Sequence, residues 1–253
     1  MAKKKDRKLM LRIVIAGVLI VVATVLMAVG LKSLYPPPQP KTSVKSSPPP
    51  APMPEGAEGI DVSSHQGEID WDLVAQSGIE FAMVRLGYRG YDSGTLHIDQ
   101  YARKNLEGAR AAGLQIGAYF FSQAVNAEEA KQEAALALQV LDGMPLDLPL
   151  VYDWEYVSAQ ARTGDMDGET LLACVEGFCT SLGDYQPMIY FNKELSRTLL
   201  DLDELEQYPF WLAQYREELE FPYAVGMWQY TDQGVVDGID GYVDRDRYYG
   251  IGE

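Results

Sequence analysis

Short apolar runs alternate with segments of helical periodicity from Gly59 to the end of the chain. This alternation predicts parallel strands joined by helices, because a parallel connection needs a crossover of helical length. Five strands are expected in such units, at Gly59–Val62, Phe81–Leu86, Gln115–Phe121, Val151–Glu155 and Met188–Phe191. Three more apolar runs follow with little helix between them, at Phe210–Gln214, Val225–Tyr230 and Ile239–Val243. The pattern predicts an α/β fold: an incomplete TIM-like (β/α)5(β)3 barrel.

The segments between the strands carry ordinary helix start and stop signals. We expect a short helix over Ile69–Ser77 and a longer one over His97–Ala112, which Gly113 ends. Asn126 caps the longest helix, whose Ala and Leu side chains form one stripe. A further helix covers roughly Asp167–Leu182.

The first 58 residues differ in composition from the rest of the chain. Residues 1–12 form a basic cytoplasmic tail with six Lys or Arg, and an apolar run of 19 residues follows at Ile13–Leu31. As a helix this run is about 28 Å long, which matches a bilayer core. The charges before it keep the amino terminus inside, so we expect a single-pass cell-membrane anchor with the rest of the chain outside the cytoplasm. A signal peptide cleaved near Ala28-Val29-Gly30 is the alternative.

Residues 32–58 are interpreted as a linker, and residues 59–253 as one folded domain. Nine of the 14 prolines lie between Pro36 and Pro54, which is typical of a semi-rigid spacer, although a proline-rich ligand has the same composition. Residues 59–253 hold 12 Lys or Arg and 34 Asp or Glu, a net charge near −22. Such a domain is repelled by nucleic acid and by anionic surfaces, so we expect no nucleic-acid partner. We expect a monomer.

The two cysteines, Cys174 and Cys179, are five residues apart in a helix-like segment. They therefore lie on different faces, too far apart for a disulfide bridge. No metal-ligand pattern surrounds them, and the fold is expected to hold without disulfides.

The run Val151–Glu155 carries two acids inside an apolar segment. Because a strand alternates its faces, Asp153 and Glu155 point to one side and Trp154 points to the other. Two like charges on one face of a buried strand are costly unless something pairs or uses them. Such a pair suits cleavage of a glycosidic bond, in which one carboxyl donates a proton while the other is ionised. Solvated acids at a strand end would give the same pattern.

Other acids and several aromatic residues are placed at strand ends. Asp61 ends the first expected strand and Asp244 the eighth, which is where barrel enzymes carry their reacting residues. Aromatic faces stack on the apolar faces of sugars, although any single aromatic residue is more often part of a core or rim. The candidates for sugar binding are Tyr88, Tyr119, Tyr190, Trp211, Tyr215, Trp228 and Tyr230.

Several segments together resemble glycoside hydrolase family 25, the Chalaropsis-type lysozymes. They are GIDVSSHQGEIDW, FAMVRLGYRGY, GAYFFSQA, VYDWE, PMIYFNK, FWLAQY and MWQYTDQGVVDGIDGYVDRD, which extend over nearly all of residues 59–253. The resemblance implies an incomplete barrel and no cofactor. It also implies hydrolysis of the β-1,4 bond between N-acetylmuramic acid and N-acetylglucosamine in the glycan strands of peptidoglycan.

The family's acidic positions fall on Asp61, Asp153, Glu155 and Asp244. By resemblance, Glu155 is the general acid, with its proton held by partial burial and by the charge of Asp153. Asp153 stays ionised and orients the substrate's N-acetyl group as nucleophile, while direct attack by water remains an alternative. Asp61 and Asp244 line the floor of the site, and Tyr88 and Tyr119 its walls.

The chain departs from the family pattern at Asp246, where many relatives carry Asn, which leaves the role of Asp246 open. His65 is interpreted as a structural residue, and Gly164–Glu169 lacks the ligand spacing of a calcium loop, so no metal is expected. Two alternatives remain: a catalytically silent wall-binding module on the same fold, and a hydrolase of another amino sugar polymer such as chitin.

Overall fold

A computed structural model describes residues 53–250 of the chain. The basic tail at 1–12, the apolar run at 13–31 and most of the linker at 32–58 therefore lie outside the described residues. Within residues 53–250, no helix is long and apolar enough to cross a membrane.

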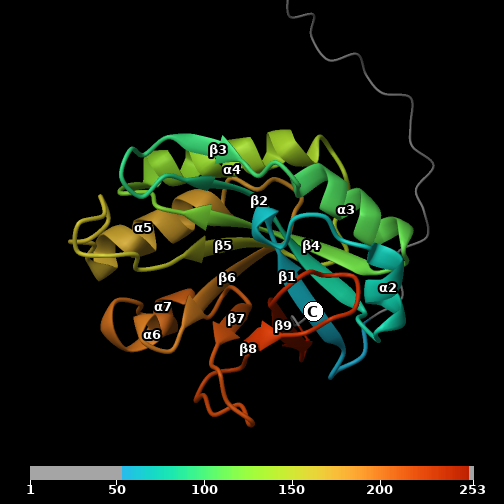
Figure 1. Cartoon of the computed structure of the whole chain (residues 1–253). Helices are drawn as coiled ribbons and strands as arrows, with labels where there is room; N and C mark the ends of the chain where they lie inside the picture. Colours follow the sequence, from blue (N-terminus) through green and yellow to red (C-terminus); the bar gives the residue numbers. More distant parts are fainter. Residues whose placement is uncertain (1–52, 251–253) are drawn as a thin grey trace, which may run out of the picture. The chain divides into compact units, whose positions relative to one another are not determined.

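Eight strands form a closed barrel, in which β1 pairs with both β2 and β9 (Figure 1). Neighbouring strands from β1 to β8 are parallel, whereas β9 is antiparallel to both β8 and β1. The predicted eight-stranded α/β barrel is thus confirmed. Its strands are β1 (Glu58–Val62), β2 (Phe81–Arg89), β4 (Gln115–Ser122), β5 (Leu150–Trp154), β6 (Pro187–Asn192), β7 (Phe210–Ala213), β8 (Met227–Gly234) and β9 (Val243–Tyr248).

Helices cover the outside of the first half of the ring (Figure 1). A 3-10 turn, η1 (Ser64–Gln66), follows β1, and the longer connections contain α2 (Trp71–Gln76), α3 (Ala102–Ala111), α4 (Ala127–Leu141) and α5 (Gly168–Cys179). After β6, the only helices among the described residues are α6 (Leu195–Thr198) and α7 (Leu202–Leu205), of four residues each. The helical layer is therefore incomplete, as the sequence predicts.

Side-chain caps begin the two longest helices where the sequence predicts them. The Asn126 side chain accepts a hydrogen bond from the backbone N–H of Glu129 at 3.0 Å. The Asp167 side chain accepts one from the backbone N–H of Thr170 at 2.7 Å. Each bond satisfies an N–H group that has no partner within the helix.

The alternation of β5 divides its side chains between two apolar layers. Val151 packs inside the barrel with residues such as Met83 and Trp211, whereas Tyr152 and Trp154 pack outside it, against the helices. Asp153 is therefore directed into the barrel, the same side as Val151. The fold places the acidic pair at the mouth through this alternation.

The structure corrects two predicted boundaries. The eighth strand is Val243–Tyr248 and not Ile239–Val243, because Ile239 is a buried loop residue. The helix predicted to begin at His97 begins at Ala102, because His97 belongs to β3 (Leu96–Ile98). This short strand pairs with β2 outside the ring.

Candidate active site

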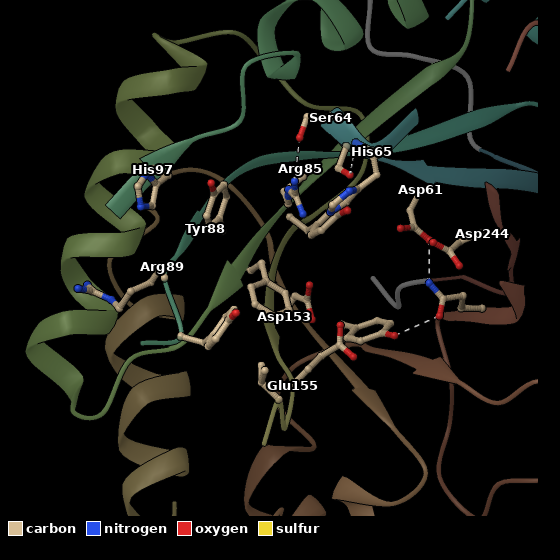
Figure 2. Close-up of a pocket in the computed structure, with 18 of the residues that line it drawn as sticks. Asp61, Ser64, His65, Arg85, Tyr88, Arg89, His97, Asp153, Glu155 and Asp244 are labelled. Atoms are coloured by element: carbon tan, nitrogen blue, oxygen red, sulfur yellow. Dashed lines mark hydrogen bonds between the residues drawn. The ribbon is translucent and has the colours of Figure 1, made fainter. Parts of the chain in front are cut away.

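A cleft of about 720 Å³ opens at the end of the barrel to which β1 and β5 deliver their acids. Figure 2 shows Asp61 and Asp244 on one side of it and Tyr88 and His97 on the other. Arg85, Asp153 and Glu155 lie between these two groups in the same view, with the two acids below Arg85. All four acids predicted from the sequence line this cleft.

Asp244 reaches the mouth by a route that the sequence did not indicate. Because β9 runs antiparallel to its neighbours, the beginning of β9 and the end of β1 lie at the same end of the barrel. Asp244 is the second residue of β9 and is directly opposite Asp61 in the register of the two strands. The prediction that Asp244 ends its strand is wrong, although its place at the mouth is right.

Burial raises the pKa of every acid in this group. Asp61 and Asp153 are only 6% and 5% exposed, and burial is the largest cause of the raised pKa of each. Repulsion from Glu155 raises the pKa of Asp153 further, whereas the positive charge of Arg85 lowers it. Burial also raises the pKa of Asp244, to about 6. The carboxyl groups of the cleft therefore bind their protons more strongly than free carboxyl groups do.

Glu155 is partly exposed, one residue beyond the end of β5. Its pKa is raised first by burial and second by repulsion from Asp244, a residue that the sequence reasoning did not connect with it. The repulsion between Asp153 and Glu155 raises the pKa of Asp153 and not that of Glu155. Partial burial of Glu155, as expected from the sequence, is thus the main reason for its raised pKa.

Gln229 connects three residues of the cleft and was missed in the sequence. Its Nε2 donates to Asp61 Oδ2 at 2.8 Å, and its Oε1 accepts from the hydroxyls of Tyr190 at 3.1 Å and Tyr215 at 3.0 Å. This amide fixes the orientation of Asp61 and of two aromatic rings. Its position as a polar residue between Trp228 and Tyr230 in a predicted strand was the signal that could have identified it.

Five of the seven predicted aromatic residues line the cleft, namely Tyr88, Tyr119, Tyr190, Trp211 and Tyr215. Trp228 and Tyr230 do not, because Gln229 between them faces the inside of the barrel and both therefore face outward. Trp228 Nε1 donates to the backbone carbonyl of Gln214 at 2.8 Å, and the Tyr230 hydroxyl donates to Glu58 at 2.6 Å. Neither residue therefore lies where a sugar bound in this cleft would stack.

The opposite wall combines a cation with stacked rings. The guanidinium of Arg85 lies 5.2 Å from the centre of the Tyr88 ring, which stacks on His97 at 4.8 Å. Arg85 Nε donates to Asp99 at 2.9 Å, which holds the guanidinium in place. His65 also lines the cleft.

A buried amide holds the backbone of Glu155. Gln123 Nε2 donates to the Glu155 carbonyl at 2.8 Å and to the Ser122 carbonyl at 2.9 Å, while Gln123 Oε1 accepts from Thr163 Oγ1 at 2.6 Å. The following loop is anchored by Arg162, whose two terminal nitrogens donate to Glu129 at 2.5 and 2.8 Å. The fixed backbone limits where the Glu155 carboxyl can point.

The other candidate residues are accounted for outside the cleft. Cys174 and Cys179 are buried free thiols, as expected from their spacing. Within residues 53–250, no group of three or more His, Cys, Asp or Glu side chains is arranged to hold a metal ion. Chemically, the cleft offers a pair of acids at the end of β5 with raised pKa values, a cation whose charge acts on one of them, and aromatic walls. These groups suit proton transfer to a leaving oxygen and stabilisation of a positive centre.

The comparisons with known proteins point to one family. Residues 60–239 match the profile of Glycosyl hydrolases family 25. The uncharacterised protein YegX of Escherichia coli K12 is 32% identical over 204 residues, which cover 77% of this chain and 70% of that protein. The autolytic lysozyme of Clostridium acetobutylicum is 27% identical over 201 residues, 76% of this chain and 55% of that lysozyme.

A solved structure supports the same likeness. The modular autolysin LytC of Streptococcus pneumoniae, in complex with a synthetic peptidoglycan ligand, superposes with a TM-score of 0.67 at 28% identity. The match covers 77% of this chain and 47% of LytC. The chain thus spans about half the length of LytC and of the clostridial lysozyme.

Proposed function

Because this chain belongs to glycosyl hydrolase family 25 and is a glycoside hydrolase, we propose that it is a muramidase. The proposed reaction is hydrolysis of the β-1,4 bond between N-acetylmuramic acid and N-acetylglucosamine in peptidoglycan. The main observation in support of this reaction is the Asp153–Glu155 pair at the mouth of the barrel, in a cleft lined by aromatic rings. The lysozyme relatives and the peptidoglycan ligand of LytC support this choice of polymer.

Glu155 is the proposed general acid. Burial and the charge of Asp244 raise its pKa, so the group keeps a proton that it can donate to the leaving glycosidic oxygen. Its partial exposure leaves the carboxyl accessible to a substrate in the cleft. General acids of this kind typically contribute about 100- to 10,000-fold in rate.

Asp153 is the proposed stabiliser of the reaction centre. Positive charge develops at the anomeric carbon in the transition state, and a buried carboxylate beside it is effective because little water screens the attraction. Burial and Glu155 raise the pKa of Asp153 overall, and the positive charge of Arg85 opposes them, acting toward the ionised form that this role needs. In this role Asp153 also orients the substrate's N-acetyl group as nucleophile, with direct attack by water as the alternative route.

The remaining cleft residues are proposed to bind and orient the sugar. Asp61 and Asp244 form the floor, where Gln229 fixes Asp61 through a 2.8 Å hydrogen bond. The rings of Tyr88, Tyr119, Tyr190, Trp211 and Tyr215 form the walls on which sugar faces stack.

A digestion experiment tests this function. Purified peptidoglycan and chitin are incubated side by side with residues 53–253, and new reducing ends are counted. Mass spectrometry then identifies the sugar at each new end. We expect release from peptidoglycan alone, with N-acetylmuramic acid at the new reducing end. Release from chitin at a similar rate would replace the proposed substrate, and binding without release from either polymer would indicate a silent wall-binding module.

We also propose that the enzyme acts outside the cytoplasm while anchored in the cell membrane as a monomer. The support is the apolar run Ile13–Leu31, the six basic residues before it and the proline-rich spacer after it. Protease added to intact wall-stripped cells should remove the barrel and leave a short membrane-bound stub. Finding the protein mainly in the culture medium, with a new amino terminus near Leu31, would replace the anchor with a signal peptide.

A further inference from the structure

Asp246 is a fully buried acid directly beneath the cleft. It lies on β9, two residues after Asp244 and on the same face of the strand. Asp246 is opposite Gly59 in the register with β1, and Asp244 is opposite Asp61, so Asp246 and Asp61 are diagonal neighbours. Asp246 does not line the cleft and takes no part in the proposed reaction.

The two oxygens of Asp246 have different surroundings. Oδ1 accepts a hydrogen bond from Trp211 Nε1 at 2.8 Å. Oδ2 is buried, and no donor among the described residues reaches it. Buried oxygens in folded proteins nearly always have a hydrogen-bond partner, so this one requires an explanation.

Asp61 is the acidic neighbour that the strand register places beside Asp246, and a hydrogen bond with Asp61 acts to lower the pKa of Asp246 against the effect of burial. Its own Oδ2 accepts from Gln229 Nε2 at 2.8 Å. Two carboxylates in contact offer only acceptors to each other, so a hydrogen bond between them needs a proton on one of them. Two ionised carboxylates buried together would also repel each other at close range.

The surrounding charges favour retention of that proton. Asp244 and Asp153 both face Asp61 and add negative charge from β9 and β5. The positive charge of Arg245 acts in the opposite direction on Asp246, but the Arg245 guanidinium donates to Glu58 at 2.9 Å outside the ring. Two uncharged groups donate hydrogen bonds to the pair, Trp211 from β7 and Gln229 from β8. The Tyr119 hydroxyl from β4 is also uncharged, because burial and the charge of Asp61 raise its pKa.

We propose that Asp246 and Asp61 share a single proton, so that the pair carries one negative charge at neutral pH. Asp246 is then a positioning residue: it orients Asp61 through the shared proton and the Trp211 ring through the indole hydrogen bond. The inference concerns the free protein and does not rest on the proposed reaction.

Carbon-13 NMR of aspartate side chains tests the pair directly. In wild-type residues 53–253, the carboxyl carbons of Asp61 and Asp246 should titrate together in two separate steps, with one proton retained between them at pH 7. Independent titration of both carbons, with each ionised well below pH 7, would overturn the proposal. So would retention of two protons at pH 7. This measurement needs no variant.

The Asp246→Asn variant provides a second measurement. Its amide oxygen can still accept from Trp211, and its N–H can donate to Asp61 in place of the shared proton. Asp61 should then titrate in one step at lower pH, and infrared spectra should show one protonated carboxyl group fewer than wild type at pH 7. Asp240→Asn, at an exposed position, is the matched control and should leave both signals unchanged. An equal number of protonated carboxyls in wild type and Asp246→Asn would overturn the proposal.

Discussion

Replacing Gln123 by Leu should show separately how this side chain contributes to the stability of the barrel and to the position of the Glu155 carboxyl group. The side chain is fully buried, and Leu fills a similar volume without its polar atoms. The change removes two hydrogen bonds donated by Nε2, to the carbonyls of Glu155 and Ser122, and one accepted by Oε1 from Thr163. Only the bond to the Glu155 carbonyl bears on the general acid.

The structure sets the expected magnitudes. At about 1 kcal/mol net for each hydrogen bond, the loss of three lowers the free energy of unfolding by about 3 kcal/mol. A misplacement of a catalytic group by roughly 1 Å costs on the order of 100-fold in rate. Because Arg162 still anchors the loop through Glu129, we expect a smaller shift, and kcat to fall between about 10- and 100-fold.

Thr163→Val is the matched control. It removes one hydrogen bond of the same amide but leaves the contact with the Glu155 carbonyl intact, so it should cost about 1 kcal/mol and change kcat by less than about threefold. Urea unfolding gives the stabilities, and release of reducing ends from peptidoglycan, measured where both variants are folded, gives kcat. A Gln123→Leu enzyme that loses stability but keeps kcat within about threefold of wild type would refute the positioning argument.

Two further changes probe the charges and the packing of the barrel. Asp244→Asn removes the negative charge that raises the pKa of Glu155, so the alkaline limit of any residual activity should move to lower pH. An unchanged pH profile would show that the charge of Asp244 does not act on Glu155. Gly117→Ala places a methyl group against Met83 inside the barrel and should lower the free energy of unfolding by about 1–3 kcal/mol. A urea midpoint equal to that of wild type would contradict the tight packing at this glycine.

The sequence predicted the parts of the fold and the site that depend on local periodicity. The alternation in β5 separates Asp153 from Trp154, and the cap Asn126 begins its helix, because these signals depend on neighbours within a few residues. The last strand was predicted too early in the chain because Ile239 is apolar, and apolar runs are the usual signal for a strand.

The sequence did not predict strand β9 correctly, because the partners of its charged residues are distant in the sequence. Asp244 and Asp246 face the inside of the barrel. Arg245 and Arg247 donate hydrogen bonds to Glu58 on β1, which is nearly 190 residues earlier in the chain. Gln123 and Gln229 act through contacts of the same long-range kind, with Glu155 and with Asp61. No local pattern encodes such contacts, so they become visible only once the barrel closes.

The central claim is that Glu155 donates the proton that breaks the glycosidic bond. The most direct measurement is kcat of Glu155→Gln on purified peptidoglycan, with Glu169→Gln at an exposed position as the matched control. The amide keeps the shape of the side chain but has no acidic proton to donate, so we expect a loss of at least about 100-fold, with an unchanged urea midpoint. A folded Glu155→Gln enzyme that retains more than about a tenth of wild-type turnover would contradict the assignment.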